Sequence, residues 1–159
     1  MVYTVRLGLI LTSVIVQAIR GCPNGWTAFN DSCYLVSFHK EDWSAASTDC
    51  HSYHGYLAEV LDSNENNFLT ELVTQYQKHE DYWLGATDIF VEGDWRWNVN
   101  GQHLNYTNWQ HGEPDNRHSH GEDCLAAHYS SSRVQWRDYA CTSKHYFICE
   151  TRGRWITFG

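Results

Sequence analysis

The sequence predicts one extracellular domain of the α+β class that is stapled by disulfides. Three observations support this prediction: an apolar segment at the amino terminus, six cysteines after it, and two helix patterns among several short strand patterns. The chain has 159 residues, which suits a single domain with its own core. Composition is even and free of repeats from Cys22 to Glu150, so we place the domain at 22–150 and leave 151–159 as a short tail.

Residues 1–18 have the pattern of a signal peptide. Arg6 supplies the positive start, the run Leu7–Val16 is almost entirely apolar, and small residues before position 19 fit a cleavage site. A membrane anchor is the alternative, but it needs about 20 apolar residues, and Gln17 and Arg20 interrupt this run. We therefore expect a secreted, extracellular protein that is not inserted in a membrane.

The formal net charge is −8, and loss of Arg6 with the signal peptide would make it −8 − 1 = −9. An acidic chain without a cluster of Lys and Arg argues against nucleic acid or an anionic membrane as the main partner. The chain also lacks a nucleophile–base spacing and a Gly-rich phosphate loop. These absences argue against an enzyme.

An even number of cysteines behind a signal peptide predicts three disulfides in an oxidising compartment. No C-x-x-C pair occurs, so a structural zinc site or a redox motif is not expected. Six cysteines allow 15 pairings, and spacing does not choose among them. The cysteines are Cys22, Cys33, Cys50, Cys124, Cys141 and Cys149.

Two segments have helix patterns. Asp42 can cap a helix that carries Trp43 and Cys50 on one face, and Ser63 can cap a second helix. The apolar stripe of the second helix is Phe68, Leu69, Leu72, Val73 and Tyr76. Strand patterns occupy Tyr34–Phe38, Tyr82–Gly85, Asp94–Trp97, Val134–Trp136 and Tyr146–Cys149.

Residues 98–123 form a long polar segment that is rich in Asn, Gly, His and acidic residues. A loop of this length inside a compact domain is usually either functional or disordered. Trp95, Trp97 and Trp109 border or enter it, which argues for an ordered loop. A bound cation is the simplest feature that could organise it.

The acidic residues of this region are spaced as calcium ligands could be. Glu113 and Asp115 flank Pro114, Glu122 precedes Cys124, and Asp138 follows a Trp-Arg pair. Calcium takes six to eight oxygen ligands, and carboxylates supply the charge. If the Glu113–Pro114 bond is cis, which costs little only before proline, both carboxylates turn to the same side. The alternative is that Glu113-Pro-Asp115 is simply a solvated loop surface.

Together these motifs resemble the C-type lectin domain family in its long form with three disulfides. Trp83-Leu-Gly85, Glu113-Pro-Asp115 and Trp136-Arg-Asp138 are similar to the family's Trp-Ile-Gly, Glu-Pro-Asn or Gln-Pro-Asp, and Trp-Asn-Asp motifs, in the same order. The phrases 82–88 and 105–109 look most like perlucin-type lectins of mollusc shell and mucus. The resemblance implies two helices packed on two small antiparallel sheets with a long calcium-binding loop. It also implies the disulfides Cys22–Cys33, Cys50–Cys149 and Cys124–Cys141.

The resemblance further implies calcium as cofactor and glycans as partners, in microbial recognition or a shell matrix. Two sugar hydroxyls would complete the coordination of a principal calcium ion. The principal ligands would be Glu113, Asp115, Glu122 and Asp138; contacts to carbohydrate would come from Glu113, Asp115, Glu122 and Arg137. An auxiliary calcium would be held by Asp88, Glu92, Asn116, Glu122 and Asp123, although Asp88 and Glu92 could instead cap the turn before Gly93.

Two residues depart from the family pattern. Arg137 stands where the family has an Asn that ligates calcium, and a guanidinium has no acceptor atom. Arg137 must therefore point away or donate a hydrogen bond to the sugar or to a carboxylate, and calcium affinity should be lower. Glu113 is typical of mannose-type and Asp115 of galactose-type lectins, so we expect binding of both sugar types.

Some features allow other interpretations. A scaffold that has lost sugar binding would be an interaction or mineral-matrix protein, with Arg137 as the sign. His118 and His120, or His51 and His54, suggest zinc, but a polar surface explains them better. Sequons at Asn30 and Asn105 predict glycosylation. No neck or heptad is present, so a homo-oligomer would use the domain surface or the tail.

Overall fold

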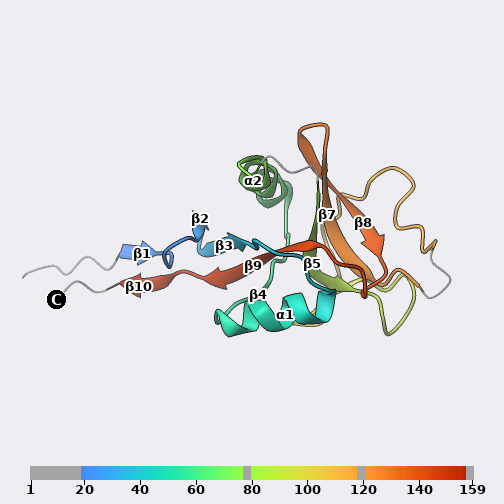
Figure 1. Ribbon diagram of the computed structural model, residues 1–159, viewed down its shortest axis with the longest axis horizontal. Coiled ribbons are helices and arrows are strands. Elements are labelled where there is room, and N and C mark those ends of the chain that lie inside the picture. Colours follow the sequence, from blue (N-terminus) through green and yellow to red (C-terminus); the bar gives the residue numbers. More distant parts are fainter. Residues whose placement is uncertain (1–18, 77–79, 118–120, 157–159) are drawn as a thin grey trace, which may run out of the picture.

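The computed structural model describes residues 19–76, 80–117 and 121–156 of the chain (Figure 1). Two helices and a mixed sheet place it in the α+β class, as the sequence predicts. The helices are α1 (Trp43–Ser52) and α2 (Ser63–Thr74). The strands are β1 (Ile19–Gly21), β2 (Thr27–Phe29), β3 (Ser32–Val36), β4 (Tyr56–Leu57), β5 (Asp81–Thr87), β6 (Arg96–Trp97), β7 (Cys124–Ser130), β8 (Arg133–Tyr139), β9 (Tyr146–Arg152) and β10 (Arg154–Ile156).

Both helices begin at an aspartate cap. Asp42 caps α1 as predicted, because its carboxylate accepts a hydrogen bond from the amide of Ala45 at 2.9 Å. The prediction that Ser63 caps α2 is wrong. Asp62 is the cap and accepts from the amide of Glu65 at 2.9 Å, which makes Ser63 the first helical residue. The longer carboxylate at the extended position reaches the free amide, and Ser63 is already part of the first turn.

The sheet is built around β9. The family resemblance implies two small antiparallel sheets, and β9 joins their strands into one mixed sheet of eight strands. Strand β9 pairs antiparallel with β3 and β4, and parallel with β5. Strand β5 continues antiparallel to β6 and β7, and β7 to β8. The path through the sheet is therefore β2-β3-β9-β5-β7-β8. A separate pair, β1 with β10, extends from one end of the domain (Figure 1).

Strand β7 is absent from the sequence-based prediction, which passes from the polar segment to Val134–Trp136. Its first four residues, Cys124–Ala127, are all buried. A strand that is covered on both faces lacks the apolar–polar alternation by which strands are recognised in a sequence. The predicted strand at Asp94–Trp97 is shorter than expected, since only Arg96–Trp97 pairs with β5.

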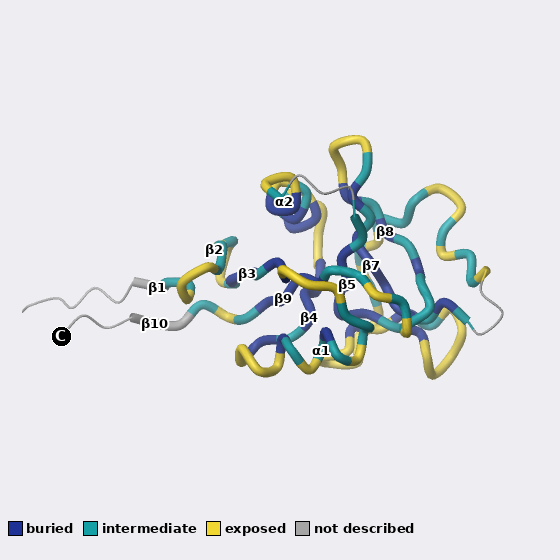
Figure 2. Tube along the Cα trace, viewed as in Figure 1, coloured by how far each residue is buried: buried dark blue, intermediate teal, exposed yellow. Residues whose placement is uncertain are grey.

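The core lies between the sheet and the two helices, where Figure 2 shows the buried segments gathered. Trp83 and Trp136 are its largest fully buried side chains, and both indole N–H groups have acceptors. Trp83 Nε1 donates to the carbonyl of Glu41 at 2.9 Å, and Trp136 Nε1 donates to Asn66 Oδ1 at 2.9 Å. These two tryptophans therefore fill the core and do not form a binding surface.

Three disulfides cross-link the elements: Cys22–Cys33, Cys50–Cys149 and Cys124–Cys141. This pairing is the one that the family resemblance implies. Cys50–Cys149 ties α1 to β9 across 99 residues of sequence. A loop of that length gives a stabilisation of about 4–5 kcal/mol in the chain-entropy account.

The described residues extend past both predicted limits of the domain, to residue 19 at one end and residue 156 at the other. The predicted signal peptide at 1–18 and the last residues of the tail, 157–159, lie outside the described residues. The first part of the tail is ordered, because β9 runs to Arg152 and β10 covers Arg154–Ile156. Neither described helix has the length and apolar character needed to cross a bilayer.

Candidate metal centre

The acidic residues of the predicted loop meet the end of β8. The Glu113–Pro114 bond is cis, and the amide of Glu113 donates to the carbonyl of Gln110 at 2.9 Å. One carboxylate oxygen each from Glu113, Asp115 and Asp138 lies within 4.8 Å of the others. We call this group the loop cluster. It is the group of three potential metal ligands that the described residues bring together.

Asp138 fixes the loop cluster to the sheet. Its side chain is 3 % exposed and points toward the loop from β8. Oδ1 accepts from the amide of Asp115 at 3.1 Å, and Oδ2 accepts from the amide of Asn116 at 2.8 Å. Because the sheet is rigid, these two bonds position the loop backbone beside the strand.

The electrostatics of the loop cluster favour a cation. Burial raises the pKa of Glu113 to about 7, and the hydrogen bond to Asp138 and the charges of Asp115 and Asp138 add to the rise. Arg117 Nε lies 2.8 Å from Asp115 Oδ2, but the Arg117 side chain is 81 % exposed and can move aside. Carboxylates held this close repel one another, and a hard divalent cation relieves that repulsion with oxygen ligands.

Glu122, the fourth predicted ligand, lies next to the loop cluster and is not part of it. Its Oε2 accepts from the amide of Arg117 at 2.8 Å, and its own amide donates to Asn116 Oδ1 at 2.8 Å. Asn116 therefore bridges Glu122 to Asp138. The structure thus brings three of the four predicted ligands together, and it links the fourth, Glu122, to Asp138 through two hydrogen bonds of Asn116.

Two of the residues predicted for an auxiliary calcium, Glu92 and Glu122, are hydrogen-bonded to the same Asn116. Asn116 Nδ2 donates to Glu92 Oε2 at 2.6 Å. Asp88 does cap its turn, since Oδ2 accepts from the amide of Gly93 at 2.8 Å, but Oδ1 is buried without a partner. Burial, with the charges of Glu92 and Asp123, raises the pKa of Asp88 to about 6. A buried carboxylate oxygen without a donor is an available metal ligand.

Comparison with known proteins shows the family to which this chain belongs. The model of the Lectin C-type domain matches residues 39–151. This protein belongs to the C-type lectin family. It is 35 % identical over 130 residues to the Perlucin-like protein of Mytilus galloprovincialis, covering 80 % of this chain and 81 % of that protein. Perlucin of Haliotis laevigata is also 35 % identical, with 82 % and 83 % of the two chains covered.

Solved structures agree with this assignment. The carbohydrate-recognition domain of the mouse scavenger receptor C-type lectin superposes with a TM-score of 0.77 at 33 % identity, covering 84 % of this chain and all of that one. The fold is therefore a C-type lectin fold in which the loop between β6 and β7 carries the acidic motif.

Arg137, the departure from the lectin pattern, points away from the loop cluster. Along β8 it alternates with the buried Asp138. Its Nε donates to Gln110 Oε1 at 2.7 Å, and Nη1 donates to the hydroxyl of Tyr139 at 3.3 Å. Of the two arrangements expected for Arg137, the structure shows the one in which it points away from the calcium ligands. The charge still reaches the site, since Arg137 moderates the rise in the pKa of Glu113.

Sequence reasoning missed the residues that hold the loop in place. The side chain of Gln110 accepts a hydrogen bond from Arg137, and the backbone amide of Gln110 donates to the carbonyl of Trp136 at 2.9 Å. Asn116 was expected as a ligand, whereas here it organises its neighbours at a φ of 45°. Asn is among the few residues that adopt this backbone conformation readily, and that is the only signal the sequence offered. Both sequon residues, Asn30 and Asn105, are exposed, while His118 and His120 lie outside the described residues.

Proposed function

We propose that this protein is a secreted lectin that binds carbohydrate through calcium held by Glu113, Asp115, Glu122 and Asp138. The observation that carries the proposal is the approach of three of these carboxylates to within 4.8 Å, beside a rigid strand. The donor set is entirely oxygen, which suits calcium. When bound, calcium would supply a positive centre to which two sugar hydroxyls coordinate.

The side chains of the chain itself would orient the sugar. Glu113, Asp115 and Glu122 only accept hydrogen bonds when ionised, so each can take the proton of a sugar hydroxyl. Arg137 is bound to Gln110 and contributes no ligand, which leaves Asp138 as the one strand ligand of the site. Lacking an amide donor at positions 113 and 115, the site should accept both mannose-type and galactose-type sugars.

We propose an auxiliary calcium at Asp88, Glu92, Asn116, Glu122 and Asp123. The free, buried Oδ1 of Asp88 supports this proposal. Such an ion would share Glu122 and Asn116 with the principal site. Binding at the two positions would then be coupled.

The relatives named above are lectins, and we propose that this protein likewise binds without catalysis. Three disulfides fit an oxidising compartment, which supports export directed by residues 1–18. A shallow site for one sugar should bind weakly, near the millimolar level or about −4 kcal/mol.

Retention on sugar columns tests the proposal. The purified chain is loaded on mannose and galactose resins in calcium, then washed with EDTA or with the free sugar. We expect elution by both washes. Passage through both resins in calcium, or retention that neither wash reverses, would contradict a calcium-dependent lectin.

A second candidate is an interaction or mineral-matrix protein on a lectin scaffold that no longer binds sugar. The observation that favours it is Arg137, which occupies the family's Asn position and is committed to Gln110. Under this proposal calcium would still bind and stabilise the loop. A glycan array that stays blank in calcium, together with a calcium-dependent rise in melting temperature, would favour this candidate over the first.

A further inference from the structure

A hollow lies at the end of the domain away from the acidic loop. Its volume is about 370 Å³, and three segments far apart in sequence wall it. They are the stretch before β2, the turn after α1, and the end of β9. In Figure 1 these segments lie toward the β1–β10 pair, whereas the loop between β6 and β7 lies at the opposite end of the long axis.

Two aromatic rings form a corner in this hollow. Trp26 and Tyr53 meet edge to face, with ring centroids 6.4 Å apart and planes at 78°. Trp26 is half-buried and packs against the core, which fixes its ring. Tyr53 is 51 % exposed and leaves its ring open to solvent. Rigid Trp and Tyr rings offer large apolar contact at little entropic cost, and such a corner suits the apolar face of a sugar ring.

A cation stands beside the aromatic corner. Arg152 is exposed and lines the hollow. The described residues that line the hollow include no acidic side chain, although the chain holds 19 acidic residues against 11 Lys and Arg. A planar guanidinium pairs in bidentate fashion with a carboxylate or sulfate. The chemistry of the hollow is therefore complementary to an acidic group carried by an apolar ring.

The turn that presents Tyr53 is tied to the sheet. His54 has a φ of 60°, an uncommon conformation for a residue other than glycine. Its carbonyl accepts from Thr151 Oγ1 at 3.0 Å, and the amide of Gly55 donates to the carbonyl of Cys50 at 3.0 Å. A strained backbone that the surrounding structure holds in place often marks a functional position. Here it fixes the aromatic corner relative to Arg152.

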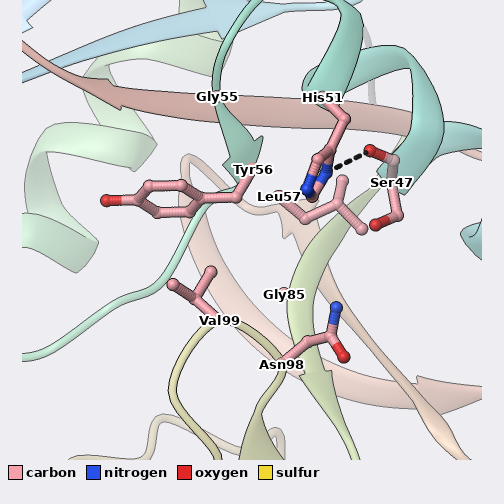
Figure 3. Close-up of a pocket in the computed structure, with 8 residues that line it drawn as sticks. All are labelled: Ser47, His51, Gly55, Tyr56, Leu57, Gly85, Asn98 and Val99. Carbon is pink, nitrogen blue, oxygen red and sulfur yellow. Dashed lines mark hydrogen bonds between the residues drawn. The ribbon is translucent and has the colours of Figure 1, made fainter.

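A neighbouring hollow of about 340 Å³ provides a contrast (Figure 3). There Ser47, His51 and Asn98 supply polar groups, and the ring of Tyr56 is directed away from them. Its lining, as far as the described residues supply it, contains neither an Arg nor a Lys. It shares the size of the first hollow but lacks the combination of an open aromatic face with a cation.

We propose that the hollow formed by Trp26, Tyr53 and Arg152 is a second, calcium-independent binding site for a short acidic saccharide. The sugar ring would lie against Tyr53 and Trp26, and its carboxylate or sulfate would pair with Arg152. Because the two sites lie at opposite ends, one chain could bridge two glycans without forming an oligomer. The net charge of −8 opposes long acidic polymers, which favours short oligosaccharides or chain ends.

Isothermal titration calorimetry in excess EDTA tests this site while the calcium site is inactive. The probes are a chondroitin sulfate tetrasaccharide, a hyaluronan tetrasaccharide that carries carboxylates only, and neutral chitotetraose. We expect the acidic probes to bind and chitotetraose to bind at least about tenfold more weakly, which matches one charged hydrogen-bonded pair. Binding of the sulfated probe alone would support the site and narrow its ligand to sulfate.

Variants separate this site from general charge effects. Arg152→Gln should weaken binding of the acidic probes about tenfold, and Tyr53→Ser should also weaken it, whereas Glu113→Gln should leave it unchanged. Arg133→Gln is the matched control, because Arg133 is an exposed Arg at the β7–β8 turn outside the hollow. Unchanged melting temperatures would show that the variants fold. The proposal would be overturned if neither acidic probe bound. It would also be overturned if Arg152→Gln and Arg133→Gln lost the same amount of affinity.

Discussion

Two groups of carboxylates in this molecule differ in how deeply they are buried and in how many hydrogen-bond donors they have. The loop cluster lies at the edge of the domain, where Glu113 and Asp115 are only half-buried. Glu59, Glu65 and Glu150, which we call the buried cluster, lie beside β9 with exposures of 7 %, 9 % and 6 %. Both groups bring like charges together, so each needs something to offset the repulsion.

Hydrogen-bond donors of the chain supply most of that offset in the buried cluster. Glu65 accepts from the hydroxyl of Tyr34 and from the amide of Leu61. Glu150 accepts from the hydroxyl of Ser32 at 2.7 Å and from the amide of Glu59 at 3.2 Å. The carboxylates of Glu65 and Glu150 thus have hydrogen-bond donors within the fold. Glu65 also joins α2 to the sheet. Only Glu59 Oε1 is buried without a partner.

In the loop cluster, fewer hydrogen-bond donors offset the repulsion among the carboxylates, and this difference indicates the role of the cluster. Asp138 accepts two amide hydrogens, but Asp115 is paired with a largely exposed Arg117, and burial together with its acidic neighbours raises the pKa of Glu113. A structural group of acids is satisfied by the fold itself. A group that is left partly unsatisfied at an accessible edge is suited to an external cation. The four predictions below test this distinction.

The largest effect should come from removing one ligand of the loop cluster. Glu113→Gln or Asp138→Ala should weaken calcium binding about a hundredfold, and calcium-dependent sugar retention should disappear, since calcium affinity depends on the number of charged ligands. Calcium titration by calorimetry measures the first effect and the sugar column the second. The comparison requires Glu65→Gln to retain both activities. Equal losses from the two clusters would show that the distinction is wrong.

The buried cluster should instead control stability. Burial and the charges of Glu150 and Glu65 raise the pKa of Glu59 to about 7. The fold therefore favours the protonated acid, so this contribution is full below the unfolded pKa of about 4.5 and is lost as pH rises through about 7. Glu59→Gln imitates the neutral form and should stabilise the protein at about pH 8 on the order of 2 kcal/mol.

Denaturant unfolding in EDTA at neutral and mildly acidic pH measures this stabilisation. The stability difference between Glu59→Gln and the parent should shrink as the pH falls below about 7 toward the unfolded pKa. A variant that is less stable than the parent at every pH would mean that ionised Glu59 is stabilising. That result would remove the contrast between the two clusters.

Mild acid should release calcium from the loop cluster. Calcium binds the ionised carboxylates, and the pKa of Glu113 is raised to about 7 without the ion. Between about pH 7 and pH 6 the ionised fraction of Glu113 should fall about fivefold, and the apparent calcium affinity should fall with it. Calorimetric titrations across this range measure the effect. A calcium affinity that does not change with pH would contradict it.

The smallest effect should come from Arg117. Its Nε competes for Asp115 Oδ2 at 2.8 Å, but its side chain is 81 % exposed and the pair is screened by solvent. Arg117→Gln should raise calcium affinity by no more than about threefold, which corresponds to a surface ion pair of under 1 kcal/mol. Arg133→Gln is the control for the lost charge. A drop in affinity would show that Arg117 supports the loop and does not compete for the ligand.

The sequence by itself determined the local features of this protein. Asp42 marked the start of α1, the apolar stripe marked α2, and the tripeptide around Pro114 marked the acidic loop. Six cysteines and the ordered motifs identified the family and, through it, the disulfide pairing. Each of these signals lies within a few residues of chain or in the composition, where helical periodicity, capping and charge are directly visible.

Only the tertiary structure decided what depends on distant neighbours. Strand β7 is buried on both faces and therefore has no alternating pattern. Glu113 and Glu65 look equally polar in the sequence, yet one lies at an open edge and the other accepts hydrogen bonds inside the fold. Trp26, Tyr53 and Arg152 are brought together across more than half of the chain. Burial and partners are set by how the elements pack, and no local pattern records them.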